Sequence, residues 1–141
     1  MKKILFNLML VLFLGIGMIS CGQNQKGGIR VTDVIQNNVI SYISPADLNK
    51  LTDRSQLIDI RTPREYAEGH IKEAKNINFY DPGFAGYIGK LDKNKAVYIY
   101  CRSGNRTGYA VQQLKKMGFT EIYDLRGGIN NWKKNNLEIN K

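Results

Sequence analysis

Short apolar runs alternate with helical segments along most of the chain from residue 39 onward. The expected strands are rich in β-branched and aromatic residues and cover Val39–Tyr42, Leu57–Ile60, Asn76–Phe79, Ala96–Tyr100 and Glu121–Leu125. Strands that alternate with helices favour parallel pairing, with helices packed on both faces of one sheet. The sequence therefore predicts a single α/β domain over residues 39–141, built on five short and mainly parallel strands.

Two of the expected helices have clear start signals. Residues 44–47 read Ser-Pro-Ala-Asp and residues 62–65 read Thr-Pro-Arg-Glu. Each places a hydroxyl at the N-cap, proline at the first helical position and an acid at the third, which is a capping box. Asp81-Pro82 is expected to open a third helix. The longest helix is expected over Asn105–Met117, ending at Gly118, and a last one over Ile129–Asn135.

Residues 1–20 have the features of a bacterial secretion signal, because Lys2 and Lys3 precede an almost uninterrupted apolar stretch. The 16 residues from Ile4 to Ile19 would extend ~24 Å as a helix, short of the ~30 Å hydrocarbon core of a membrane. Residues 18–21, Met-Ile-Ser-Cys, resemble a lipobox. We expect a lipoprotein signal peptide over 1–20, lipid on Cys21, and a flexible tether over 21–38. The protein would be exported and anchored to a bacterial membrane, facing the periplasm or the cell surface.

The positive charge does not indicate a nucleic-acid partner. The chain has 21 Lys and Arg against 12 Asp and Glu, a formal net charge of +9. Loss of Lys2 and Lys3 with the signal peptide leaves 19 basic and 12 acidic side chains. These basic residues are scattered and alternate with Asp, Glu and Asn, which is typical of a solvated surface and not of a nucleic-acid binding stripe.

Cys101 is the only thiol that remains if Cys21 carries lipid. It directly follows an expected strand, and a short polar loop leads from it into the longest helix. Ligands bind at this edge of parallel sheets, and the free N–H groups of such a loop form an anion cradle. Arg102 and Arg106 add positive charge that favours the thiolate. The sequence predicts that Cys101 is a nucleophile and not an inert buried thiol.

Several segments, in this order and spacing, resemble a single-domain rhodanese. They are Leu57–Arg61, Glu65-Tyr66, Gly69–Ile71 with Ala74, the loop after Cys101, and Leu125–Gly128 followed by Trp132. The resemblance covers roughly Ile43 to Asn135. It implies a five-stranded parallel sheet flanked by helices. It also implies a cysteine that accepts a sulfane sulfur as a persulfide and passes it to a nucleophilic acceptor.

The resemblance assigns roles to the residues around Cys101. Cys101 matches the sulfur carrier, and the loop after it matches the cradle whose backbone amides hold the outer sulfur. The expected substrate-binding residues are Arg102, Ser103, Gly104, Asn105, Arg106 and Thr107. Gly104 is expected at positive φ because the loop is tight. Thr107 could form a hydrogen bond inward or simply continue the helix.

Three further residues match the family pattern as structural supports of the site. Asp59 and Arg61 follow a buried strand and are expected to pair and so hold the helix that Thr62 caps. His70, the only histidine, is expected to pack and form hydrogen bonds and not to act as a base. Persulfide chemistry needs a nucleophile and an anion site, so no metal or cofactor is expected.

Two other functions stay open at this point. Cys-dependent phosphatases and arsenate reductases share the strand, loop and helix layout, but their loop is Cys-x5-Arg, whereas Arg106 gives Cys-x4-Arg here and Tyr100 precedes the cysteine in place of His. A non-catalytic, membrane-anchored module could instead bind a partner protein or sense sulfur anions. For the enzyme we expect a small anionic donor such as thiosulfate, an acceptor that is a thiol, cyanide or a protein, and a monomer.

Overall fold

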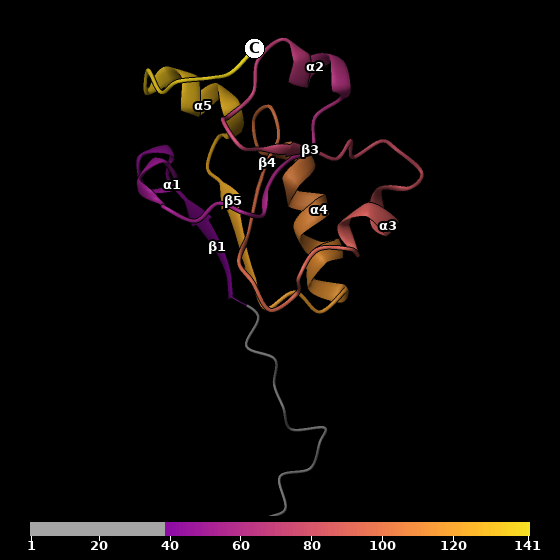
Figure 1. Ribbon diagram of the computed structural model, residues 1–141. Helices are drawn as coiled ribbons and strands as arrows, with labels where there is room; N and C mark the ends of the chain where they lie inside the picture. The colour runs from indigo at the N-terminus through magenta and orange to yellow at the C-terminus, as the bar shows by residue number, and fades with distance from the viewer. Residues whose placement is uncertain (1–38) are drawn as a thin grey trace, which may run out of the picture. The chain divides into compact units, whose positions relative to one another are not determined.

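The structure, a computed structural model, describes residues 39–141 (Figure 1). Its elements in chain order are β1 (Val39–Ile43), α1 (Pro45–Lys50), β2 (Leu57–Asp59), α2 (Pro63–Ala67), β3 (Lys75–Asn76), α3 (Phe84–Ile88), β4 (Val97–Tyr100), α4 (Asn105–Lys116), β5 (Glu121–Leu125) and α5 (Gly128–Lys134). The predictions for the signal peptide, the tether and Cys21 lie outside the described residues. Between residues 39 and 141, every helix is too short or too polar to cross a membrane.

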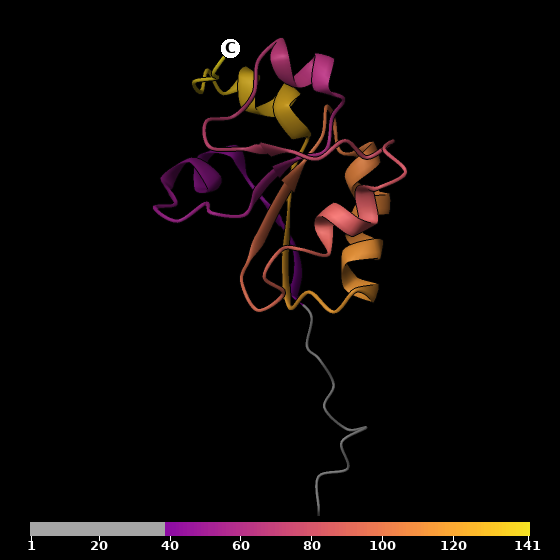
Figure 2. The same ribbon diagram turned by 45° about the vertical axis from the view of Figure 1, so that its right-hand side comes forward.

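The five strands form one parallel sheet in the order β1-β5-β4-β2-β3. Alternate residues along each strand face opposite sides, so Val97 and Ile99 pack under α3 and α4 while Tyr100 packs with α1 and α5. Figures 1 and 2 show these two helical layers on either side of the strands. The α/β prediction, with five parallel strands and helices on both faces, is confirmed.

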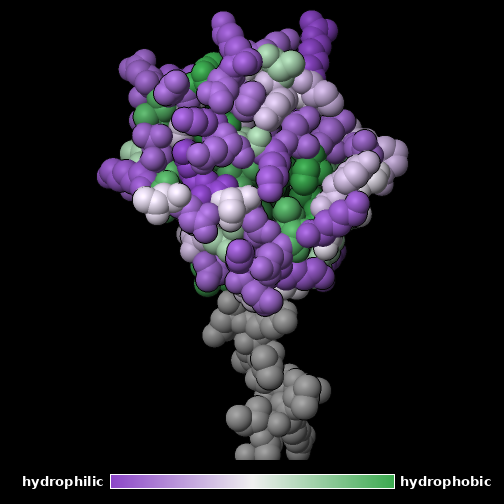
Figure 3. Space-filling model, viewed as in Figure 1, coloured by the Kyte–Doolittle hydropathy of each residue, from purple (hydrophilic) through white to green (hydrophobic). Residues whose placement is uncertain are grey.

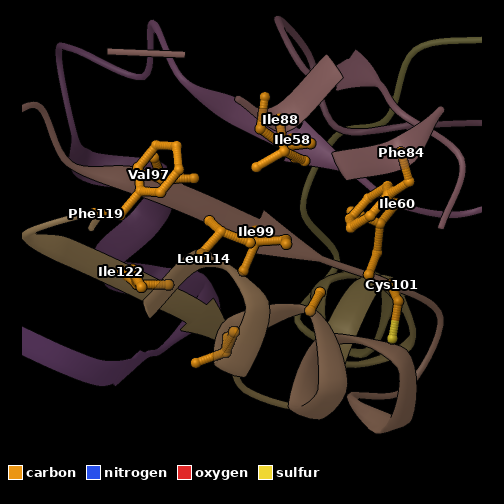
Figure 4. Close-up of a cluster of buried hydrophobic side chains, with 12 residues drawn as sticks. Ile58, Ile60, Phe84, Ile88, Val97, Ile99, Cys101, Leu114, Phe119 and Ile122 are labelled. Carbon is orange, nitrogen blue, oxygen red and sulfur yellow. The ribbon is translucent and has the colours of Figure 1, made fainter. Parts of the chain in front are cut away.

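The larger core lies between the sheet and the layer made of α3 and α4 (Figure 4). Ile58, Ile99 and Leu114 are fully buried there, and Cys101 lies at the end of the cluster where β4 leaves the sheet. The second core, on the opposite face, includes Trp132 and Tyr100. The two cores fix β4 from both sides, so the position of the residue that follows it is fixed as well.

The capping predictions hold fully at one helix and partly at another. At α2, Glu65 N–H donates to Thr62 Oγ1 at 3.3 Å and the Glu65 carboxylate accepts from Thr62 N–H at 3.0 Å. At α1, Ser44 Oγ accepts from Asp47 N–H at 3.1 Å, but the Asp47 carboxylate contacts the Ser44 hydroxyl and not its N–H. Aspartate is one methylene shorter than glutamate, so it does not complete the box.

Two elements differ from the sequence prediction by more than one residue at one end, whereas the other boundaries agree to within one residue. The strand expected over Asn76–Phe79 covers only Lys75–Asn76. Beyond it, the chain still runs beside the end of β2, because Ile77 N–H donates to the Asp59 carbonyl and Phe79 N–H donates to the Ile60 carbonyl. The third helix starts at Phe84 and not at Asp81-Pro82, because the Asp81 carboxylate accepts from Gly83 N–H at 2.7 Å and forms a turn first.

Candidate functional site

Cys101 follows the last residue of β4 and opens the loop that leads into α4. Gly104 N–H donates to Cys101 Sγ at 3.1 Å. Gly104 has φ +108°, so the positive φ predicted from the sequence is confirmed. A residue with a side chain rarely adopts this conformation. The loop therefore turns back on the sulfur and points a backbone N–H at it. Cys101 is 1% exposed, so its sulfur is almost completely covered by the surrounding chain.

Helix α5 holds the same loop from the other side. Ile129 N–H donates to the Cys101 carbonyl at 3.0 Å, and Asn130 N–H donates to the Arg102 carbonyl at 3.1 Å. A Cβ on Gly128 would lie 2.5 Å from the Cys101 carbonyl oxygen. Only glycine allows this approach of the two backbones. The sequence analysis did not identify this contact, although the Gly127-Gly128 pair was its visible signal.

The Arg106 side chain is held by Glu65 and Tyr80. Its guanidinium donates to both Glu65 carboxylate oxygens at 2.7 Å, and its Cζ lies 5.7 Å from the centre of the Tyr80 ring. The Arg106 hydrogen bonds lower the pKa of Glu65 to about 2, and the same contact raises the pKa of Arg106. The sequence analysis gave Glu65 only a capping role and did not single out Tyr80.

Thr107 faces inward, where it connects the loop to β5. Its Oγ1 lies 2.8 Å from the Gly104 carbonyl oxygen and 2.9 Å from Asp124 Oδ2. Asp124 is 6% exposed, and burial raises its pKa to about 6, partly offset by the Thr107 hydrogen bond. The other oxygen, Asp124 Oδ1, is buried and has no hydrogen-bond partner. The sequence analysis did not identify this carboxylate as part of the site.

Asp59, Arg61 and His70 hold neighbouring segments of the chain together. The Arg61 guanidinium donates to Asp59 Oδ2 at 2.6 Å and to the Gly69 carbonyl at 2.8 Å, and both side chains are buried. The His70 ring stacks on Tyr66 with centroids 3.8 Å apart, and its backbone N–H and carbonyl bond to Asn140. These contacts join β2 to the segment that follows α2 and to the C-terminus.

The remaining predicted residues of the loop, Arg102, Ser103 and Asn105, have exposed side chains. No cluster of His, Cys, Asp and Glu suited to a metal ion occurs within residues 39–141. The site therefore has one buried sulfur that accepts a hydrogen bond from a backbone N–H, and two nearby arginines in different environments. Arg106, in the first turn of α4, is paired with Glu65, whereas Arg102, on the loop, is exposed.

The parallel sheet and the cysteine at the junction of a central strand and a helix place the chain in the class of α/β proteins with a cysteine-bearing loop at the carboxyl edge of the sheet. Within that class, the family model described as "Rhodanese-like domain" matches residues 44–135. The chain belongs to the rhodanese-like family.

The relatives of the chain agree with this assignment. A protein of Allochromatium vinosum named "Sulfurtransferase" is 36% identical over 88 residues, which cover 62% of this chain and 80% of that protein. A "Thiosulfate sulfurtransferase GlpE" of Shewanella oneidensis is 31% identical over 93 residues, covering 64% and 90%. The crystal structure of a rhodanese-related protein from Thermoplasma volcanium superposes with a TM-score of 0.64 at 28% identity, covering 71% of this chain and 97% of that one.

Proposed function

We propose that this protein is a sulfurtransferase in which Cys101 carries a sulfane sulfur as a persulfide. The observation that carries the proposal is the Gly104 N–H directed at Cys101 Sγ within a loop held at positive φ. A backbone donor so placed stabilises an anionic sulfur without any proton relay. Relatives named sulfurtransferase and thiosulfate sulfurtransferase support the same reaction class.

The reaction has two steps that balance without a cofactor. In the first, the Cys101 thiolate attacks the outer sulfur of thiosulfate; a new S–S bond forms, the S–S bond of thiosulfate breaks, and sulfite leaves with the electron pair. In the second, an acceptor thiolate or cyanide attacks the outer sulfur of the Cys101 persulfide, and the Cys101 thiolate is the leaving group. The loop amides hold the negative charge of the persulfide between the steps.

The contacts of Arg106 argue against the phosphatase alternative. A phosphatase loop uses its arginine to grip the oxyanion with two parallel hydrogen bonds. Here both of those donor directions are taken by Glu65, at 2.7 Å each. With one residue fewer in the loop as well, the site suits a sulfur atom better than a phosphate. Turnover of an aryl phosphate by the unmodified protein would reverse this ranking.

Mass spectrometry of the intact protein tests the proposal. The reduced protein should gain the mass of one sulfur atom after thiosulfate is added and lose it when cyanide is added. Cys101→Ser should gain no sulfur, while its unfolding curve stays close to that of the wild type because the two side chains are nearly the same size. A wild-type protein that never gains sulfur would overturn the proposal and favour the non-catalytic binding module.

We also propose that the protein is exported and anchored through lipid on Cys21. The charged start, the short apolar stretch and the Ser20-Cys21 pair support this proposal. In bacterial cells, Cys21→Ser should release the protein from the membrane fraction or leave the precursor uncleaved. An unprocessed wild-type protein found in the soluble cytoplasmic fraction would contradict it.

A further inference from the structure

A polar cleft of about 240 Å³ lies next to the Cys101 loop, lined by residues of α2 and its two flanks, of the loop and of α5. Helices α2 and α5 lie side by side at the carboxyl end of the sheet in both ribbon views (Figures 1 and 2). That end of the molecule is largely covered by hydrophilic side chains in the view of Figure 3. The hydrogen bonds from Ile129 and Asn130 to the loop carbonyls fix the cleft relative to the sulfur.

Some of the charged side chains that line the cleft have an ion-pair partner, and others have none. Arg61 is paired with Asp59 at 2.6 Å, and Glu65 is paired with Arg106 at 2.7 Å. Glu68 contacts Arg64 at 3.4 Å outside the cleft.

Two cations remain. Within residues 39–141, neither Arg102 on the loop nor Lys133 on α5 has a carboxylate within salt-bridge distance. Lys133 follows Asn130 by about one turn of helix, a rise of about 5 Å. The cleft is therefore set to receive an anion that extends from the loop along α5.

We propose that this cleft binds the sulfur acceptor, and that the acceptor is a small thiol that carries carboxylate groups. The inference rests on the proposed sulfurtransferase function and adds the chemical class of the acceptor. The carboxylates lie against Arg102 and Lys133 while the thiolate reaches the outer sulfur of the persulfide. The new S–S bond then forms on the acceptor, and the electron pair of the broken bond returns to Cys101. Cyanide has no carboxylate and gains nothing from these cations.

Discharge of the persulfide separates this step from sulfur uptake. The full chain is loaded with thiosulfate, and the loss of the added sulfur is followed with mercaptosuccinate, 2-mercaptoethanol or cyanide in single turnovers. Lys133→Glu should lower the rate constant for mercaptosuccinate about tenfold relative to that for 2-mercaptoethanol. We expect this factor because the substitution removes one weak attraction between Lys133 and a carboxylate of the acceptor and puts a repulsion of similar size in its place.

Lys134→Glu is the matched control, since Lys134 is the next residue on α5, is exposed and does not line the cleft. It changes the net charge by the same amount, so its ratio of the two rate constants should stay within twofold of the wild-type ratio. The acceptor assignment would be overturned if Lys133→Glu and Lys134→Glu lowered the ratio of the mercaptosuccinate and 2-mercaptoethanol rate constants equally. A wild-type ratio that does not depend on ionic strength would overturn it as well. Absence of any sulfur on the wild type after thiosulfate would instead contradict the sulfurtransferase function itself.

Discussion

At the scale of single residues, Asp124 shows how one proton controls the contact between β5 and the Cys101 loop. Thr107 has one hydroxyl hydrogen but lies within hydrogen-bond distance of both Gly104 O and Asp124 Oδ2. Both bonds are made only if Asp124 is protonated and donates to Thr107, which then donates to Gly104. Ionised Asp124 takes the hydrogen of Thr107 for itself and leaves the Gly104 carbonyl with only the Gly108 N–H.

The ionisation of Asp124 makes the stability of the protein fall as pH rises. Its pKa is raised from 3.8 to about 6 in the folded state, so the folded protein holds this proton more tightly than the unfolded chain does. The stability linked to the proton is fully present below about pH 4 and is lost as pH rises through about 6. Asp124→Asn removes the charge and keeps a donor for Thr107.

We expect Asp124→Asn to raise the free energy of unfolding at pH 7.5 by about 1–3 kcal/mol, from a pKa displaced by roughly two units. The gain should shrink as the pH falls from 6 towards 4, because the wild-type carboxyl is then neutral too. Urea unfolding of both proteins at pH 7.5 and pH 4.5 measures it. An Asn variant that is less stable than the wild type at both pH values would show that the carboxylate itself is needed.

At the scale of elements, the loop after Cys101 is held by two helices that meet it in different ways. Helix α4 continues from the loop, and Gly104 at φ +108° makes the turn between them. Helix α5 contacts the loop from the side, and a Cβ added at Gly128 would overlap the loop backbone. Glycine is thus required at Gly104 for the backbone conformation and at Gly128 for space. Alanine should therefore affect the two positions differently.

Gly128→Ala should be the most damaging alanine substitution in this region. The added Cβ would lie 2.5 Å from the Cys101 carbonyl oxygen and 2.7 Å from Arg102 backbone atoms, at φ +60°. We expect a loss of about 2–4 kcal/mol in the free energy of unfolding, because neither backbone can move without breaking the hydrogen bonds between α5 and the loop. Gly128→Ala should also lower sulfur uptake from thiosulfate. Thermal unfolding and intact mass measure the two effects.

Two glycines without close neighbours serve as controls for this prediction. A Cβ at Gly104 meets nothing within 4 Å, so Gly104→Ala should cost only the backbone strain, about 1–2 kcal/mol. Gly108 lies inside α4 with equal space, and Gly108→Ala should stabilise the helix by about 0.5–1 kcal/mol. Similar losses at Gly104 and Gly128 would mean that α5 does not hold the loop as we describe.

At the scale of the whole molecule, local patterns predicted the fold and the position of Cys101 at the end of a strand, but not the contacts around it. The alternation of strands and helices, the Thr62 capping box and the positive φ of Gly104 are all readable within a few neighbouring residues. The Arg106–Glu65 pair joins residues 41 positions apart, and the Thr107–Asp124 contact joins residues 17 positions apart. These contacts depend on the order of the strands in the sheet, which no local pattern contains.

The C-terminal segment closes the second core from outside the span that the family model matches, which ends at residue 135. The Glu138 backbone carbonyl accepts from the indole N–H of Trp132 at 2.9 Å, and Asn140 exchanges two backbone hydrogen bonds of 2.8 Å with His70. Leu137 and Ile139 pack against the buried residues of this core. The segment therefore ties α5 to the chain that follows α2, on the face opposite to α4.

Deletion of residues 137–141 should lower the free energy of unfolding by about 2–4 kcal/mol, because it removes the apolar area of two half-buried side chains and four hydrogen bonds. The hydrogen bonds from α5 to the Cys101 loop start at Ile129 and Asn130, upstream of the deletion, so sulfur uptake from thiosulfate should persist at temperatures where the variant is folded. Removal of Lys141 alone, which is exposed, should change neither property. Thermal unfolding and mass spectrometry of the three proteins compare them. A folded truncation that no longer takes up sulfur would show that the C-terminal segment also positions the loop, because the loss could not then be assigned to stability.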